Sequence, residues 1–229
     1  MQLYANIDDL EKKVVSCRLC PRLVSYRETC LLNDKKYEGV EFWRKPVPGH
    51  GDINGKMLIV GLAPAASGGN RTGRVFTGDK SSDFLFSCLY SLKLSNKPMS
   101  VSRDDGLVYN GMFITAAVKC VPPDNKPTNE EINNCSRYLD NEVRLMKNLR
   151  SIVCLGKIAF EAVDRLYRNQ SRSKNKNYFK NGKFYSYGNI RIYCLYHPSP
   201  RNVNTGKITK EEFTEILRKA NRYANMGSS

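Results

Sequence analysis

The feature that most constrains this fold is a short apolar run that leads straight into a glycine-rich segment. Met57–Val60 is continuous, apolar and partly β-branched, which is typical of a strand buried on both faces. The chain then enters the segment 61–79, where glycines allow sharp turns and a close approach of the backbone to a ligand. Four of these glycines stand at positions 61, 68, 69 and 73, and a fifth stands at position 78. Because open α/β sheets bind ligands where strands end in such loops, we expect a ligand site here.

Three further apolar runs alternate with segments of helical periodicity. The runs are Met112–Val118, Ser151–Leu155 and Ile190–Tyr196. Two helical segments are Ser81–Leu92 and Lys157–Tyr167. Two more open with Thr-x-x-Glu capping boxes: one begins at Thr128 and runs to about Asn148, and the other begins at Thr209 and runs to about Ala224. Alternation of this kind predicts a parallel sheet with right-handed crossovers. We therefore expect a three-layer α/β/α fold around a central four-stranded parallel sheet, forming one domain over residues 1–229.

The first fifty residues are less regular. Ile7–Tyr26 is expected to be helical, with Pro21 breaking or restarting the helix, and it carries the pair Cys17 and Cys20. Prolines and glycines in the segment 27–52 indicate ordered turns. His50 lies there, in a context that matches no motif, and is left unassigned.

The chain is strongly basic. Its 229 residues carry a formal net charge of +15, which favours a polyanionic partner, and nucleic acid is the usual one. An anionic membrane is the weaker alternative, because no stretch combines a basic face with a bulky apolar one. Solubility alone is a third explanation of the charge. With no long apolar run and no signal-peptide pattern, we expect an intracellular, cytoplasmic protein that does not insert into membranes.

Part of this charge is concentrated between Arg165 and Lys183. The segment holds seven basic residues and no acidic one: Arg165, Arg168, Arg172, Lys174, Lys176, Lys180 and Lys183. Its Ser, Asn and Lys content predicts an exposed loop. Either it contacts phosphates or it is a solvated linker.

Eight cysteines in an intracellular chain favour metal binding over disulfides. Four of them form the pattern Cys-x2-Cys, a long gap, then Cys-x14-Cys: Cys17, Cys20, Cys120 and Cys135. Four thiolates suit either a structural zinc or a [4Fe–4S] cluster, and the spacing does not choose between them. The other four lie in or near apolar segments and are expected to be buried: Cys30, Cys88, Cys154 and Cys194.

A second motif, His-Pro-Ser-Pro-Arg-Asn at 197–202, directly follows the last apolar run. The glycine-rich segment contains Gly-Leu-Ala-Pro-Ala-Ala, Asn-Arg-Thr-Gly-Arg and Phe-Thr-Gly-Asp, and it fits neither the P-loop nor the Gly-x-Gly-x-x-Gly pattern. Together the two motifs resemble the active-site motifs of the uracil-DNA glycosylase superfamily, and family five of its iron–sulfur branch above all. Cys-Pro-Arg-Leu-Val at 20–24 and Val-Lys-Cys-x-Pro-Pro at 118–123 are similar to the cluster-binding segments of families four and five.

The resemblance implies a monomeric enzyme that flips uracil, and other deaminated bases such as hypoxanthine, out of DNA and hydrolyses the N-glycosidic bond. It implies a [4Fe–4S] cluster, which ties the N-terminal helix to the domain, and replication or repair proteins as candidate partners. His197 would donate a hydrogen bond to uracil O2, Asp79 would place the water and Phe76 would stack on the base. Each of the three residues has an alternative role without catalysis: His197 as a structural histidine, Asp79 as a helix N-cap and Phe76 in core packing. The other implied contacts are Gly61, Ala63, Ala65 and Ala116 to the base, and Asn70, Arg71, Arg74, Ser199, Arg201 and Asn202 to DNA.

The chain also departs from the superfamily pattern. Leu62 and Ala63 stand where the best-known members carry an acid or an asparagine, an absence that family five shares. Ala116 replaces an asparagine of family four, and Ser67 a histidine of many family-five members. These losses predict a relaxed pocket and a broad substrate range. Two other functions stay open: a non-catalytic cluster-containing protein that binds nucleic acid, and a nucleotide-binding or transferase α/β protein.

Overall fold

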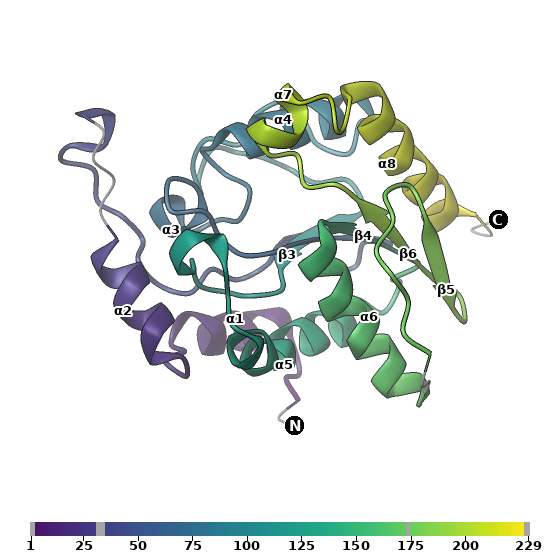
Figure 1. Ribbon diagram of the computed structural model, residues 1–229, viewed down its shortest axis with the longest axis horizontal. Coiled ribbons are helices and arrows are strands. Elements are labelled where there is room, and N and C mark those ends of the chain that lie inside the picture. Colours follow the sequence, from purple (N-terminus) through teal and green to yellow (C-terminus); the bar gives the residue numbers. More distant parts are fainter. Residues whose placement is uncertain (1–2, 31–34, 173–174, 227–229) are drawn as a thin grey trace.

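The computed structural model describes residues 3–30, 35–172 and 175–226, in which a six-stranded sheet lies between two layers of helices (Figure 1). The strand order is β1-β3-β2-β4-β6-β5. The strands are β1 (His50–Gly51), β2 (Met57–Gly61), β3 (Met112–Ala116), β4 (Ser151–Leu155), β5 (Phe184–Tyr187) and β6 (Ile190–Leu195). The four central strands are parallel, as predicted from the apolar runs, whereas β1 and β5 pair antiparallel at the two edges.

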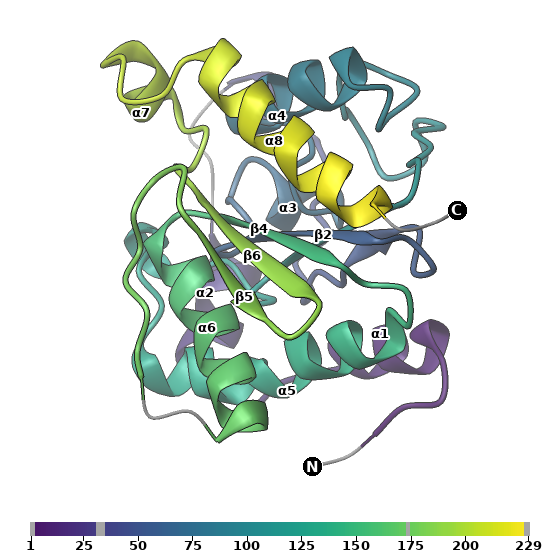
Figure 2. The ribbon, with the colours of Figure 1, turned by 90° about the vertical axis from the view of Figure 1, so that its right-hand side faces the viewer.

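The helices connect and cover these strands. They are α1 (Ile7–Val15), α2 (Pro21–Thr29), α3 (Gly69–Thr72), α4 (Lys80–Ser91), α5 (Asn129–Leu145), α6 (Lys157–Ser171), α7 (Pro200–Asn204) and α8 (Lys210–Asn225), with 3-10 turns at Lys35–Tyr37 and Pro123–Asn125. Viewed from the side, α4 and α8 lie on one face of the sheet, and α1, α5 and α6 lie on the other (Figure 2). Both capping boxes predicted from the sequence are formed, at Thr128 and at Thr209.

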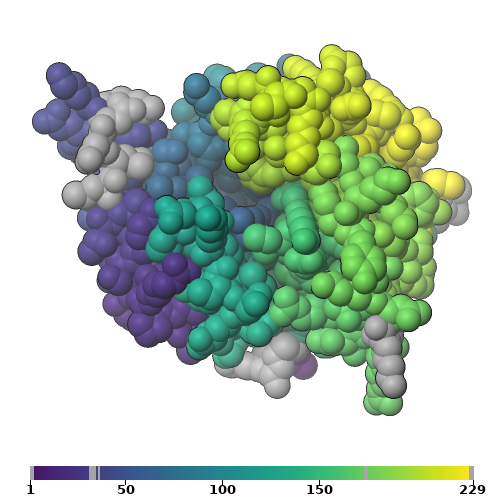
Figure 3. Space-filling model, viewed as in Figure 1, coloured from purple at the N-terminus to yellow at the C-terminus, as the bar shows by residue number. Residues whose placement is uncertain are grey.

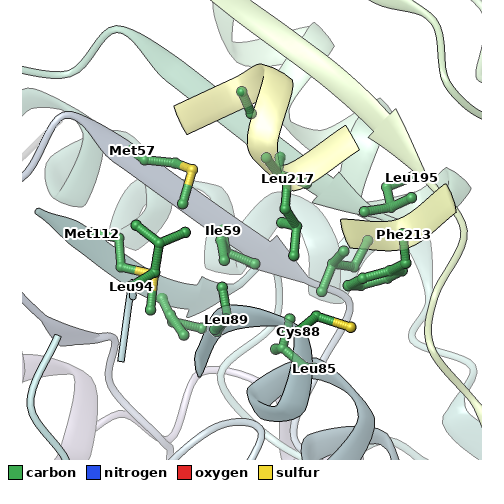
Figure 4. Packing of buried hydrophobic residues seen from close by; sticks show 14 of the residues in the cluster. Met57, Ile59, Leu85, Cys88, Leu89, Leu94, Met112, Leu195, Phe213 and Leu217 are labelled. Carbon is green, nitrogen blue, oxygen red and sulfur yellow. The ribbon is translucent and has the colours of Figure 1, made fainter. Parts of the chain in front are cut away.

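Alternate residues of each central strand enter different cores. Ile59 of β2 faces α4 and α8, where it packs with Leu89 and Leu217 (Figure 4). Its neighbours Leu58 and Val60 face α5 and α6 instead. Both cores exclude solvent, so the strands can be apolar along their whole length. The sheet is therefore a rigid support for the loops at its carboxyl end.

The N-terminal segment forms two helices, and the predicted break at Pro21 is confirmed. α1 ends at Val15 and α2 begins at Pro21, so Cys17 and Cys20 lie in and at the end of the connection. Proline is favoured at the first helical position, because its missing N–H has no helical partner there. Pro21 thus restarts the helix, and the two thiols project from irregular backbone.

The basic segment is less of a loop than predicted. The helix predicted over Lys157–Tyr167 continues to Ser171 as α6, so that Arg168 is helical as well as Arg165, and Arg168 pairs with Asp164 at 2.7 Å. Lys174 lies outside the described residues. Within the described ranges, no helix is long and apolar enough to cross a membrane.

Candidate active site

The glycine-rich segment and the His-Pro-Ser-Pro motif meet at the carboxyl ends of β2 and β6. Gly61 is the last residue of β2, and His197 follows the end of β6. In the space-filling view this face is hollowed between the yellow segment that contains α7 and the teal segment after β3 (Figure 3). The topology therefore brings together the two motifs that the sequence singled out.

Phe76 and His197 form one wall of this site. Their rings are stacked, with centroids 5.9 Å apart and an interplanar angle of 30°. Phe76 also covers Gly61, where an added Cβ would lie only 2.7 Å from Cε2 of the ring. Glycine is required at position 61 because any larger residue would displace the aromatic ring.

The backbone of Phe76 is in the left-handed region, with φ of 50°. This conformation is unfavourable for a bulky residue and persists only where the surroundings enforce it. Such strain is typical of functional sites, and here it determines where the Phe76 ring lies.

His197 is partly buried, and burial lowers the pKa of its imidazole from 6.5 to about 4. The ring is therefore neutral at physiological pH. A neutral imidazole keeps one N–H, so it can donate a hydrogen bond without carrying a charge into the site. Asn202 Nδ2 donates to the His197 carbonyl at 2.8 Å and fixes the backbone that carries the ring.

Asp79 is the N-cap of α4. Its Oδ1 accepts a hydrogen bond from Ser82 N–H at 3.0 Å, so the alternative role of this residue is confirmed. Its Oδ2 lies against Gly68, where an added Cβ would be 2.1 Å away. Burial raises the pKa of this carboxyl, which makes it a better proton acceptor.

The remaining predicted base contacts are small. Ala116 is buried at the end of β3, and Ala63 and Ala65 are partly buried in the turn after β2. Val118 N–H donates to the Leu62 carbonyl at 2.9 Å, which ties this turn to the end of β3. Because these alanine side chains offer no hydrogen-bonding group, base recognition by them would rest on shape and backbone atoms.

Two residues predicted to contact DNA are buried and structural. Asn70 is 1% exposed, and its Nδ2 donates to the Arg27 carbonyl at 3.2 Å. Arg74 is 6% exposed and pairs with Asp105 at 2.6 Å. The prediction of DNA contact is wrong for both, because a side chain enclosed by the protein cannot reach a phosphate.

The other predicted DNA contacts are more accessible. Arg201 is exposed on α7, and Asn202 is partly buried. Ser199 caps this helix, and its Oγ accepts from Asn202 N–H at 3.4 Å. Arg71 is partly buried and donates through Nε to the Ser67 carbonyl at 2.8 Å. Of these residues, Arg201 has the side chain most available to a nucleic acid.

The four cysteines of the predicted metal site surround one small enclosed cavity. Cys17 and Cys20 come from the connection between α1 and α2, Cys120 from the loop after β3, and Cys135 from α5. Burial raises the pKa of Cys120 to about 11 and that of Cys135 to about 12. These thiols would stay protonated at neutral pH unless a metal displaced the protons. The remaining four cysteines are buried, as predicted from their apolar context.

Among the described residues, no three His, Cys, Asp or Glu side chains are grouped closely enough to hold a single metal ion. The four thiols nevertheless line the same small cavity. Four cysteine thiolates are the donor set of a [4Fe–4S] cluster and also of a structural zinc. The donor set therefore fits such a cluster.

Sequence reasoning missed two cations beside these thiols. Arg27 is 2% exposed, and its guanidinium donates to Cys120 Sγ at 3.1 Å. Lys119 is 1% exposed and pairs with Glu142 at 2.7 Å. Because Lys119 directly precedes Cys120 in the sequence, it could have been predicted to lie beside the thiols. No local sequence pattern predicts that Arg27 lies there.

A family model described as the uracil DNA glycosylase superfamily matches residues 48–221. This chain belongs to that superfamily. The match includes β1 to β6, the glycine-rich segment, the His-Pro-Ser-Pro motif and most of α8. The helices α1 and α2, whose connection contains Cys17 and Cys20, lie outside it.

Similar glycosylases cover almost the whole chain. A protein of Pyrobaculum aerophilum named type-5 uracil-DNA glycosylase is 48% identical over 93% of this chain and 91% of its own length. Proteins of the same name from Thermus thermophilus and Mycobacterium leprae are 43% and 41% identical, over 93% and 96% of this chain and 96% and 97% of their own lengths. The resemblance to family five is thereby confirmed.

Proposed function

We propose that this chain is a monofunctional uracil-DNA glycosylase. It hydrolyses the bond between a flipped uracil and C1′ of deoxyribose and leaves an abasic site. The observation that carries this function is the stacked pair of Phe76 and His197 against Gly61, at the carboxyl end of the sheet. It lies in a chain that belongs to the superfamily.

His197 stabilises the departing base. As the glycosidic bond breaks, negative charge develops on the uracil, and a hydrogen bond from the neutral imidazole to O2 grows stronger with that charge. A donor of this kind contributes about 3–4 kcal/mol to transition-state stabilisation. The stacked Phe76 holds the ring of the flipped base beside the imidazole.

Asp79 positions the water that attacks C1′. Backbone hydrogen bonds from Ser82 and Ser81 fix the carboxylate, whose remaining lone pairs can accept a hydrogen bond from a water. The pKa raised by burial favours acceptance of a proton from that water. Backbone N–H groups in the turn after Gly61 share in orienting it, since Leu62 and Ala63 have no polar side chain.

The pocket accepts more than uracil. Ala63, Ala65 and Ala116 present no amide group to read the edge of a pyrimidine. Selection by shape and stacking tolerates hypoxanthine and other deaminated bases, because every base has a flat face. Arg201, exposed next to the site, enters the duplex or contacts its backbone and so helps to keep the base flipped.

The four cysteines at positions 17, 20, 120 and 135 bind a [4Fe–4S] cluster. Their common cavity and the donors Arg27 and Asn134 toward their sulfur atoms support this assignment. When bound, the cluster supplies structure, because excision of a base needs no redox step. It joins the N-terminal connection to the loop after β3 and to α5.

The activity is tested with an oligonucleotide that contains one uracil. We expect abasic product, revealed by alkaline strand cleavage, from uracil DNA and none from the matched thymine control. The alternative, a non-catalytic nucleic-acid-binding protein, predicts binding with no abasic site. A panel of duplexes with hypoxanthine, xanthine or another altered base then defines the substrate range.

A further inference from the structure

His50 is a partly buried histidine that the reaction described above does not use. It lies on β1, the short antiparallel strand at one edge of the sheet. Its Nε2 is 3.0 Å from the carbonyl oxygen of Val75. Val75 directly precedes Phe76, the residue with the left-handed backbone and the ring stacked on His197. One hydrogen bond therefore links an edge strand to the base-stacking residue.

The direction of this hydrogen bond follows from chemistry. A carbonyl oxygen only accepts, so the imidazole must carry its proton on Nε2. Burial and the neighbouring Arg74 lower the pKa of His50 to about 3, so that the ring is neutral and has this one N–H. Its Nδ1 is buried and finds no hydrogen-bond partner among the described residues.

That orphaned nitrogen indicates why a histidine stands here. A phenylalanine would fill the same space without burying an unpaired acceptor, which costs free energy. Packing against the ring of Tyr109, with centroids 5.1 Å apart, would also be available to phenylalanine. The feature that only the histidine supplies is the N–H directed at Val75.

A second set of bonds holds the other side of the same loop. Arg74 Nε donates to Thr77 Oγ1 at 3.0 Å, and Gly78 N–H donates to the Ser100 carbonyl at 2.8 Å. Phe76 thus lies between two anchored points. The strained φ of 50° is imposed between them, with His50 holding the preceding carbonyl.

We propose that His50 is a positioning residue for base excision: its hydrogen bond to Val75 keeps Phe76 in the left-handed conformation that places the ring beside His197. The proposal rests on the role of Phe76 in stacking the flipped base. His50 touches neither the base nor the reacting atoms, and it acts through Phe76 alone.

The test compares variants that differ in the donor. His50→Phe keeps a ring and removes the N–H, and His50→Leu removes it in a second background, so that the result does not depend on one variant folding. Both should slow single-turnover excision of uracil about tenfold, the expected effect of losing one buried hydrogen bond, with DNA affinity unchanged. His50→Gln, whose amide N–H reaches a similar point, should stay within about twofold of wild type. Tyr109→Phe is the matched control, because it removes a neighbouring buried hydroxyl without a partner, and it should not change the rate.

A double-mutant cycle distinguishes an effect of His50 through the Phe76 ring from a general destabilisation of the protein. With Phe76→Leu as background, His50→Phe should have no further effect. Equal slowing in both backgrounds, a His50→Gln enzyme as slow as His50→Phe, or a His50→Phe enzyme at the wild-type rate would overturn the proposal. Wild-type protein that leaves no abasic site would instead refute the proposed function and the inference with it.

A measurement without DNA complements the kinetics. The sequence has one tryptophan, Trp43, whose ring lies against Gly73. Gly73 is the first residue of the loop 73–79, which connects α3 to α4 and contains Phe76. His50→Phe should increase quenching of its fluorescence by acrylamide, whereas His50→Gln should leave it as in wild type. Identical quenching in the His50→Phe and wild-type proteins would contradict a loop held by His50.

Discussion

At the scale of single residues, the site depends on a glycine that leaves room for an aromatic ring. In Gly61→Ala, the new Cβ would lie 2.7 Å from Phe76 Cε2 and would push the ring away from His197. Overpacking of this kind destabilises the fold by about 1–3 kcal/mol. Because the displaced ring would also no longer hold the base beside His197, we expect single-turnover excision to slow by about tenfold or more. In a Phe76→Ala background the same change should cost little, because the clash is gone. A Gly61→Ala enzyme as fast as wild type would show that Phe76 need not lie there.

The partly buried imidazole of His197 makes the stability of the fold depend on pH. Its pKa is about 4 in the folded protein and near 6.5 in the unfolded chain, so the unfolded chain binds the proton first as the pH falls. Stability is full above pH 6.5 and is lost below it, by about 2 kcal/mol between pH 7.5 and 5 for this residue. Urea unfolding of wild type and His197→Asn over this range should show a steeper decline in wild type. Parallel curves would contradict a buried neutral imidazole.

Sequence patterns predicted which residues meet at the candidate site, but not which of the neighbouring residues are buried. His197, Phe76 and Gly61 belong to two motifs at strand ends, and topology alone was enough to bring them together. Asn70 and Arg74 belong to the same motifs and have polar side chains, yet they are enclosed by the protein. Their burial depends on contacts with Arg27 and Asp105, which are distant in the sequence, and no local pattern encodes it.

At the scale of elements, the end of β3 is fastened to α5 by a buried ion pair. Lys119 and Glu142 are each 1% exposed, and Thr115 donates to the same carboxylate at 2.9 Å. Removing one partner leaves an uncompensated charge, so Glu142→Leu should destabilise the protein by about 3–5 kcal/mol. Glu142→Leu combined with Lys119→Met should regain most of that loss in urea unfolding. A double variant no more stable than Glu142→Leu would contradict this account of the pair.

The elements themselves were predicted where their signals are local. Ser151–Leu155 is the strand expected from its apolar run, and the capping box at Thr128 starts α5 as predicted. The edge strands β1 and β5 were missed. β1 has only two residues, and β5 follows a basic segment and alternates between partly buried and exposed positions, so neither has the apolar run of a central strand.

At the scale of the whole molecule, the charge of +15 should dominate DNA binding. Each phosphate neutralised releases counterions, so affinity should fall steeply and log-linearly as the salt concentration rises. Neutralising Lys176 and Lys180, with Lys174 from outside the described residues, should flatten this slope if the segment contacts phosphates. Fluorescence anisotropy at several salt concentrations measures it. An unchanged slope would identify the segment as a solvated linker.

The proposed cluster also belongs to the scale of the whole molecule, because its four cysteine ligands would come from three distant parts of the chain. The purified protein should be brown, with a broad absorbance near ~400 nm. Changing any of Cys17, Cys20, Cys120 or Cys135 to Ser should bleach it and lower the melting temperature, whereas Cys88→Ser serves as a control that keeps the colour. Stoichiometric zinc without iron would refute the assignment.

Single-turnover excision by His197→Ala, on a duplex with one uracil, tests the role of the imidazole most directly. We expect a rate about 10²–10³ lower than wild type, because the donor acts as charge develops on the base, with DNA affinity near wild type. The loss should be greatest for bases that are poor leaving groups. A variant that excises uracil at the wild-type single-turnover rate would contradict the assignment of this site.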